Sequence, residues 1–263
     1  MPAYALELEV VSMNAKIRIA PSILSADLAA IGKAAEELEE CSADAIHIDV
    51  MDGHFVRNIA FGPASVRAIR GHTSLPLEVH LMIERPDLYI DKFADAGADI
   101  ATVHAESKCR IRKVLEHAKG IVLKAGIAVN PETAPERFAE YLQDADELLI
   151  MGVHPGFSGQ EFIPETIEKL RYANQEAREK GLDLSIAVDG GVNISNVRKI
   201  AEAGADTIVA SSAIFGSRSV RDAIAQLRMR GMRIPGRRLF RLIGAAQSHM
   251  TRLHFCLCLF RAC

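Results

Sequence analysis

Short apolar runs alternate with amphipathic segments along most of this 263-residue chain. The runs are apolar almost throughout, which is typical of parallel strands buried on both faces. The segments between them, such as 164–180 and 194–203, carry apolar residues at helical spacing. Asp27 is predicted to cap a helix that runs to about Glu40. The predicted strands span residues 17–21, 45–50, 77–81, 100–104, 122–128, 147–152, 184–188 and 207–210.

Eight strands that alternate with helices predict an α/β fold, a single (β/α)₈ TIM barrel with a parallel eight-stranded core. A repeated phrase supports this arrangement: a small residue, then Ala-Asp, then an apolar run. It begins at Ser42, Gly97, Asp144 and Gly204, so each copy covers about two βα units. The alternative is an open doubly wound sheet. It is disfavoured because no G-x-G-x-x-G motif follows the first strand.

Charge divides the chain unevenly. The net charge is −3, but the residues from Met229 onward contain seven Arg and no Asp or Glu, so residues 1–228 carry −10. We therefore expect an N-terminal extension over 1–14, the barrel over 15–228, and a basic, Cys-rich tail over 229–263. The tail is expected to lie outside the barrel, either disordered or unrelated to it.

Composition also limits the classes of partner that the protein is expected to bind. The acidic body argues against a nucleic-acid partner, and no apolar run approaches the ~20 residues of a membrane span. The five Cys show no disulfide or zinc-ribbon spacing. The first residues lack the pattern of a secretory signal, so the expected location is the reducing cytoplasm.

Polar residues at the predicted strand ends mark the candidate site, because TIM barrels carry their active sites at the C-terminal ends of the strands. His47 and Asp49 share one face of the second strand, His80 lies in the third, and Asp189 ends the seventh. Two imidazoles and two carboxylates suit one divalent metal ion, such as zinc, iron, manganese or cobalt. His104, at the end of the fourth strand, fits either a site or the core.

The two carboxylates also suit a proton transfer. Asp49 and Asp189 enter from different strands, so one can remove a proton from a bound substrate and the other can return one on the opposite face. A metal ion would stabilise the enediolate formed between the two steps. Gly190-Gly191 and Ser211-Ser212, after the last two strands, predict a phosphate cradle. The glycine-rich loop 155–160 is expected to close over the ligand.

Five motifs, in order along the chain, resemble the ribulose-phosphate 3-epimerase family: APSILSAD (20–27), HIDVMDGHFV (47–56), EVHLM (78–82), HPGFSGQ (154–160) and VDGG (188–191). The resemblance extends from about residue 17 to residue 228. It implies a metal-dependent isomerase of carbohydrate metabolism, in the pentose-phosphate pathway or in carbon fixation. Such an enzyme interconverts D-ribulose 5-phosphate and D-xylulose 5-phosphate, with one metal ion per subunit of a homo-oligomer.

The resemblance also implies roles for single residues. The metal ligands are His47, Asp49, His80 and Asp189. Asp49 and Asp189 are the acid/base pair. Substrate is bound by Ser22, His80, Gly156, Phe157, Ser158, Gly159, Gly190, Gly191, Ser211 and Ser212. The pocket near the reacting carbon is lined by Met51, Met82 and Met151. Ser211 departs from the glycine usual in the family, so we expect its side chain to crowd the phosphate.

Three other functions are compared with this one. An epimerase of a related ketose phosphate, such as D-allulose 6-phosphate, would use the same site. A phosphate-binding lyase or decarboxylase of the orotidine-phosphate type is disfavoured, because no Lys lies between Asp49 and Asp52. A barrel retained only for binding would be expected to have lost one of the four ligand-type residues, and none is lost.

Overall fold

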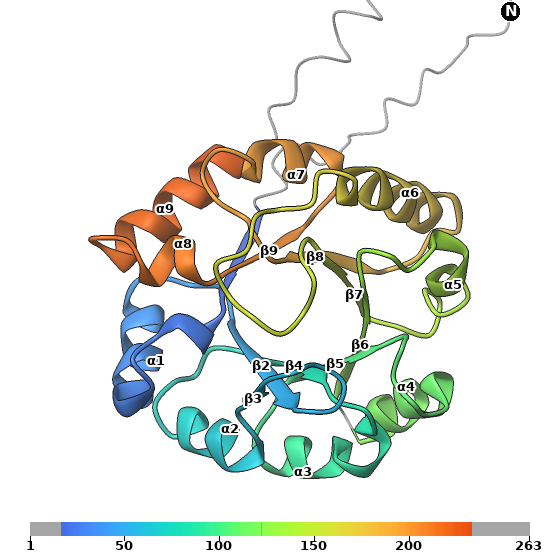
Figure 1. Cartoon of the computed structure of the whole chain (residues 1–263), viewed down its shortest axis with the longest axis horizontal. Coiled ribbons are helices and arrows are strands. Elements are labelled where there is room, and N and C mark those ends of the chain that lie inside the picture. Colours follow the sequence, from blue (N-terminus) through green and yellow to red (C-terminus); the bar gives the residue numbers. More distant parts are fainter. Residues whose placement is uncertain (1–16, 122, 233–263) are drawn as a thin grey trace, which may run out of the picture. The chain divides into compact units, whose positions relative to one another are not determined.

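The computed structural model describes residues 17–121 and 123–232, and these form the predicted (β/α)₈ barrel. Figure 1 looks down the barrel and shows a ring of strands inside a ring of helices. Eight parallel strands form the ring, and their order follows the chain. They are β1 (Arg18–Pro21), β2 (Ile46–Asp52), β4 (Leu77–Met82), β5 (Ile100–His104), β6 (Lys124–Val129), β7 (Glu147–Met151), β8 (Ser185–Asp189) and β9 (Thr207–Ala210).

The prediction of eight strands is confirmed, with ends that differ by at most two residues. The sequence pattern missed a ninth strand, β3 (Ile59–Ala60), which pairs antiparallel with the end of β2. It is only two residues long, too short to show a periodic pattern. The ring closes between β9 and β1 by a regular parallel ladder, and between β1 and β2 by a bridge that joins Ser22 and His47.

Helices cover the outside of the ring (Figure 1). The prediction that Asp27 caps the first long helix is wrong in detail: its side chain caps a 3₁₀ turn, Leu28–Ala30, and α1 begins at Ile31. None of the helices in the described ranges is long and apolar enough to cross a membrane. The helices are α1 (Ile31–Glu40), α2 (Pro63–Arg70), α3 (Ile90–Asp95), α4 (Ile111–Gly120), α5 (Pro135–Ala139), α6 (Thr166–Glu179), α7 (Val197–Ala203), α8 (Ser212–Phe215) and α9 (Val220–Gly231).

The last helix extends past the boundary expected at residue 228. Arg228 donates hydrogen bonds to the Ser42 carbonyl and to the Asp44 carboxylate, at 2.8 and 2.6 Å. Gly231 packs so closely on Ile17 that a Cβ there would lie 2.0 Å from the Ile17 side chain. The barrel therefore uses the chain to the end of α9. The expected extension 1–14, and residues 233–263 of the tail expected over 229–263, lie outside the described residues, and their separation from the barrel stays a prediction.

The repeated Ala-Asp phrase has a structural role that the sequence did not reveal. Each Asp precedes a strand and exchanges two hydrogen bonds with one residue of the preceding parallel strand. The Asp backbone N–H donates to that residue's carbonyl, and the Asp carboxylate accepts from the same residue's N–H. We call these four pairs the aspartate clamps. They are Asp44 with Ile19, Asp99 with Leu77, Asp146 with Ala125, and Asp206 with Ile186, with carboxylate distances of 2.8, 2.8, 2.8 and 3.1 Å.

The interior of the barrel is apolar in its middle and polar at the N-terminal ends of the strands. Alternate strand residues face inward, so small and apolar side chains such as Ala187, Leu149 and Val209 form a compact inner cluster. Two positions earlier on several strands lies a buried polar layer, in which Arg18 binds Glu78 at 3.0 Å. This filled interior leaves the C-terminal mouth as the place for a ligand.

Candidate active site and metal centre

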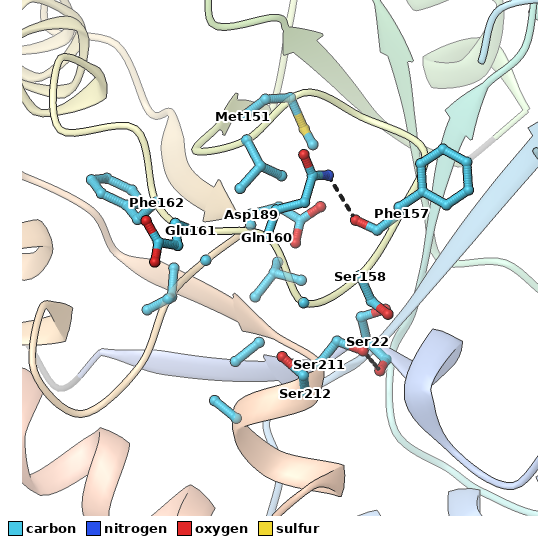
Figure 2. A pocket seen from close by; sticks show the side chains of 18 of the residues that line it. Ser22, Met151, Phe157, Ser158, Gln160, Glu161, Phe162, Asp189, Ser211 and Ser212 are labelled. Carbon is cyan, nitrogen blue, oxygen red and sulfur yellow. Dashed lines mark hydrogen bonds between the residues drawn. The ribbon is translucent and has the colours of Figure 1, made fainter. Parts of the chain in front are cut away.

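A cavity of about 630 Å³ opens at the C-terminal ends of the strands. Figure 2 shows it from close by, with Asp189 near its centre and Ser22, Ser211 and Ser212 along one side. Two predicted site residues, His47 and His80, are buried and do not line it. All the other predicted site residues do: Ser22, Asp49, Met51, Met82, Met151, Gly156, Phe157, Ser158, Gly159, Asp189, Gly190, Gly191, Ser211 and Ser212.

The four predicted metal ligands come together at the base of this cavity. His47 and Asp49 come from β2, His80 from β4, and Asp189 from the end of β8. One ligand atom from each lies within 4.8 Å of the others. His80 Nδ1 lies 3.0 Å from Asp49 Oδ1 and 3.9 Å from Asp189 Oδ2, and His47 Nε2 lies 3.5 Å from Asp49 Oδ1.

The donor set fits a divalent cation. Two imidazole nitrogens and two carboxylate oxygens are ligands that zinc, iron, manganese and cobalt accept. Both ring nitrogens of His47 are buried, and neither has a hydrogen-bond partner within the described part of the chain. A buried polar atom without a partner is costly, and a bound cation would satisfy the Nε2 atom that faces Asp49.

The two carboxylates lie in unlike electrostatic environments. Burial alone would raise the pKa of Asp49, but His47 and His80 beside it lower that pKa below its ordinary value. Ser22 Oγ also donates to Asp49 Oδ2 at 2.5 Å. Burial and the charge of Asp49 raise the pKa of Asp189 to about 7. In the protein alone, Asp49 is therefore ionised while Asp189 holds its proton more readily.

The two histidines differ as well. Burial alone would lower the pKa of His47, but Asp49 and Glu78 raise it well above its ordinary value. Burial lowers the pKa of His80 to about 4, which favours a neutral imidazole. A metal ligand must offer an unprotonated nitrogen, so His80 is already in the charge state that ligation requires.

The expected phosphate side is formed by backbone from β8 and β9. Gly190 and Gly191 have φ angles of 103° and 67°, in the region that favours glycine. A Cβ on Gly191 would lie 2.4 Å from the backbone nitrogen of Phe162, so only glycine fits at this crossing. Ser211 was expected to crowd this space, and its hydrogen bonds show where the hydroxyl group is directed. Its Oγ hydrogen-bonds to the Ser22 carbonyl at 2.9 Å and to Ser25 Oγ at 2.7 Å, which directs it toward the segment after β1.

The loop after β7 lies across the cavity mouth. The side-chain amide of Gln160 donates to the carbonyl of Phe157 at 2.9 Å (Figure 2) and to that of His154 at 2.7 Å, which holds the loop in a turn. Asn58 Nδ2 donates to the Gly156 carbonyl at 2.8 Å and so ties the loop to the hairpin after β2. The Phe157 side chain is 59% exposed and stands at the cavity rim.

Sequence reasoning missed some of the residues at the site. Asn193, Asn196 and Lys199, near the start of α7, line the cavity, and Lys199 is the one basic side chain among its lining residues. Nothing in the sequence pattern distinguished these residues from an ordinary helix start. His104, which the sequence left open, is completely buried against His80. The sequence feature that could have indicated this contact is the position of His104 at the end of β5, the strand that pairs with β4.

Comparisons with known proteins agree with this geometry. The model of the ribulose-phosphate 3-epimerase family matches residues 18–215. The chain is 48% identical to ribulose-phosphate 3-epimerase of Bacillus subtilis, over 81% of this chain and 98% of that protein. It is 42% identical to the enzyme of the same name from Escherichia coli K12, over 80% and 94%.

Among solved structures, 3-hexulose-6-phosphate synthase from Salmonella typhimurium aligns with a TM-score of 0.62. The identity is 18%, and the alignment covers 82% of this chain and 98% of that one. Tryptophan synthase from Mycobacterium tuberculosis aligns with a TM-score of 0.60 at 17% identity, over 82% and 93%. These two likenesses bear on the fold alone.

Proposed function

Because the chain belongs to the ribulose-phosphate 3-epimerase family, and is thus an epimerase, we propose that it interconverts D-ribulose 5-phosphate and D-xylulose 5-phosphate. The observation that carries this proposal is the pair of carboxylates, Asp49 and Asp189, at the base of one cavity with two buried histidines. Epimerisation at C3 requires one group that removes a proton and a second that returns one to the opposite face.

We assign the cation to His47 Nε2, His80 Nδ1 and one oxygen each of Asp49 and Asp189, because these atoms converge. A divalent ion held there would supply Lewis-acid stabilisation of the negative charge that develops on the substrate oxygens. The structure leaves zinc, iron, manganese and cobalt as candidates, since the donor set suits them all.

The unlike environments of the two carboxylates support unlike roles in the ribulose-to-xylulose direction. Asp49, with its lowered pKa and the hydrogen bond from Ser22, acts as the base that takes the C3 proton. Asp189, whose pKa is raised to about 7, donates its proton to C3 of the enediolate from the other face. The roles exchange in the reverse direction, because each carboxylate ends the turnover in the opposite protonation state.

The phosphate group of the substrate is assigned to the side of the cavity formed by Gly190, Gly191 and Ser212. Backbone N–H groups after the last two strands of a TIM barrel are a common phosphate site. Lys199 lines the same cavity and adds a positive charge. Met51, Met82 and Met151 line it as well, and we place them against the carbon chain.

The test is hydrogen exchange in D₂O with each carboxylate replaced in turn. Asp49→Asn and Asp189→Asn should each lower turnover by roughly 10²–10⁴-fold, the usual contribution of a positioned acid or base. With ribulose 5-phosphate as substrate, Asp189→Asn should still exchange the C3 proton, whereas Asp49→Asn should not.

Metal content is measured first in both variants, so that loss of the cation is separated from loss of the base. Asp91→Asn, in an exposed ion pair with His117 on the outside of the barrel, serves as the matched control. Exchange at the wild-type rate in Asp49→Asn would refute its assignment as the base. Faster turnover of another ketose phosphate, such as D-allulose 6-phosphate, would change the assigned substrate.

A further inference from the structure

A fifth side chain lies directly behind the candidate metal ligands. His104, the last residue of β5, is completely buried, and its Nε2 lies 2.8 Å from His80 Nε2. The two rings are stacked, with their centroids 5.0 Å apart, and Phe55 packs on His104 at 4.6 Å. His104 Nδ1 lies 3.1 Å from Glu106 Oε2. A continuous chain of three side chains therefore leads from the site to Glu106.

The proton positions in this chain follow from the ligand role of His80. Two ring nitrogens 2.8 Å apart must share one proton, because two N–H groups or two lone pairs would repel each other. His80 Nδ1 faces Asp49 and Asp189 and must be unprotonated to bind a cation. His80 then carries its proton on Nε2 and donates it to His104 Nε2. His104 in turn carries its proton on Nδ1 and donates it to Glu106.

Glu106 is held as a fixed acceptor at the end of the chain. Its Oε1 accepts hydrogen bonds from the Asn130 backbone N–H at 3.0 Å and from the Thr133 hydroxyl, so Oε2 is left for His104. Lys169 Nζ steadies the same loop through the carbonyls of Asn130 and Pro131, at 2.7 and 2.9 Å. Burial alone would raise the pKa of Glu106, but the hydrogen bonds from His104 and Thr133 lower it to about 2. Glu106 is thus ionised and can only accept.

We propose that His104 and Glu106 are positioning residues, which hold His80 in the Nε2–H form and so present its Nδ1 lone pair to the cation. This inference rests on the metal site of the proposed function and extends it to two residues that do not line the cavity. Partners of this kind orient a ligating histidine, and their loss usually costs about 10–100-fold in metal affinity. A residue that merely filled the core would contribute to stability without fixing the tautomer of His80.

Glu106→Gln is the informative variant, because the amide has the same shape as the carboxylate and can reverse the direction of the hydrogen bonds between residue 106, His104 and His80. The loop offers two donors to one side of residue 106, so the Gln oxygen should turn toward Asn130 and Thr133. The NH₂ group then faces His104 Nδ1 and requires a lone pair there. The His104 proton moves to Nε2, and the His80 proton moves to Nδ1, the atom that must bind the cation.

The experiment measures zinc affinity by chelator competition and tautomers by ¹⁵N NMR of histidine-labelled protein. In the zinc-loaded wild type we expect His104 to be protonated on Nδ1 and His80 on Nε2. Glu106→Gln should lose roughly tenfold or more in zinc affinity with an unchanged melting temperature. The matched control is Thr133→Val, which removes a hydrogen bond to the other oxygen of Glu106. It should lose stability while zinc affinity stays within about twofold, because the acceptor for His104 remains.

Each outcome is decisive. A zinc-loaded wild type with the His104 proton on Nε2 would overturn the inference, even if Glu106→Gln failed to fold. So would wild-type zinc affinity in a folded Glu106→Gln variant. A wild-type protein that binds no zinc, iron, manganese or cobalt would instead overturn the metal site of the proposed function, and the inference with it.

Discussion

Replacement of Glu147 by Gln should change how the stability of the barrel depends on pH. Glu147 begins β7 and points into the buried polar layer, with its side chain 3% exposed. Its Oε2 has no hydrogen-bond partner among the described residues, and the Thr102 hydroxyl donates to its Oε1 at 3.5 Å. Burial and the nearby charge of Glu78 raise the pKa of Glu147 to about 8.

The magnitude follows from the linkage between protonation and folding. The folded protein keeps this proton up to pH of about 8, whereas the unfolded chain loses it near the ordinary value of 4.5. The stabilisation is therefore complete below pH 4.5 and is lost as the pH rises through 8. Each pKa unit corresponds to about 1.4 kcal/mol, so a rise from 4.5 to about 8 gives a total change on the order of 5 kcal/mol. Gln carries no such proton, and its amide has nearly the shape of the neutral carboxyl group.

The assay is urea unfolding of chelator-treated protein at several pH values from 5 to 9, for the wild type and for Glu147→Gln. The two should have similar free energies of unfolding at pH 5, and the variant should become the more stable protein by pH 9. Other titrating groups, including Asp189, are common to both proteins, so the difference isolates residue 147. Glu202→Gln, in an exposed ion pair with Arg198 on α7, is the control and should show a constant difference from the wild type. A constant difference for Glu147→Gln as well would refute the reasoning, because Glu147 would then be ionised throughout.

Three further predictions concern the metal and the extent of the barrel. His47→Asn and His80→Asn should each lower metal affinity by roughly tenfold or more, and unchanged metal content by elemental analysis in both would remove the metal hypothesis. Metal affinity should rise with pH, because His47, whose pKa is raised well above its ordinary value, must lose a proton to bind a cation; calorimetry in two buffers of different ionisation enthalpy should detect the released proton, and a count of zero would contradict this. A chain that ends at Met232 should keep its activity and its melting temperature, since the described barrel ends with α9, and failure to fold would show that residues 233–263 are required.

The sequence predicted the ring of strands because each strand is a compact apolar run between turn signals. The four metal-type residues could be brought together by reasoning alone, because the ends of parallel strands in a barrel meet at one mouth. The same rule placed Gly190-Gly191 and Ser211-Ser212 beside the cavity. For these residues, position along a strand is enough to give position in space.

What the sequence left open at His104 and Ser211 depends on side-chain direction rather than on strand order. Both faces of these strands are apolar, so the pattern does not tell which way the last residue, such as His104, points. The direction of the Ser211 hydroxyl is set by Ser22 and Ser25, which lie nearly 190 residues away in sequence. Contacts of this kind require the packed structure, because no local pattern encodes them.

The aspartate clamps join the strands of the barrel in four neighbouring pairs, through contacts that are local in sequence. Every clamp joins residues only 20 to 25 positions apart, whereas the hydrogen bond from Arg18 to Thr207 across the final seam spans 189 positions. Closing a short loop costs less chain entropy than closing a long one, and native contacts between near neighbours in sequence can form early. The clamped strand pairs are therefore suited to form first during folding, and the seam between β9 and β1 to form last. Since His47 follows the first clamp, while Asp189 ends β8, the first of the two strands joined by the fourth clamp, the metal-binding group becomes complete only when the ring itself closes.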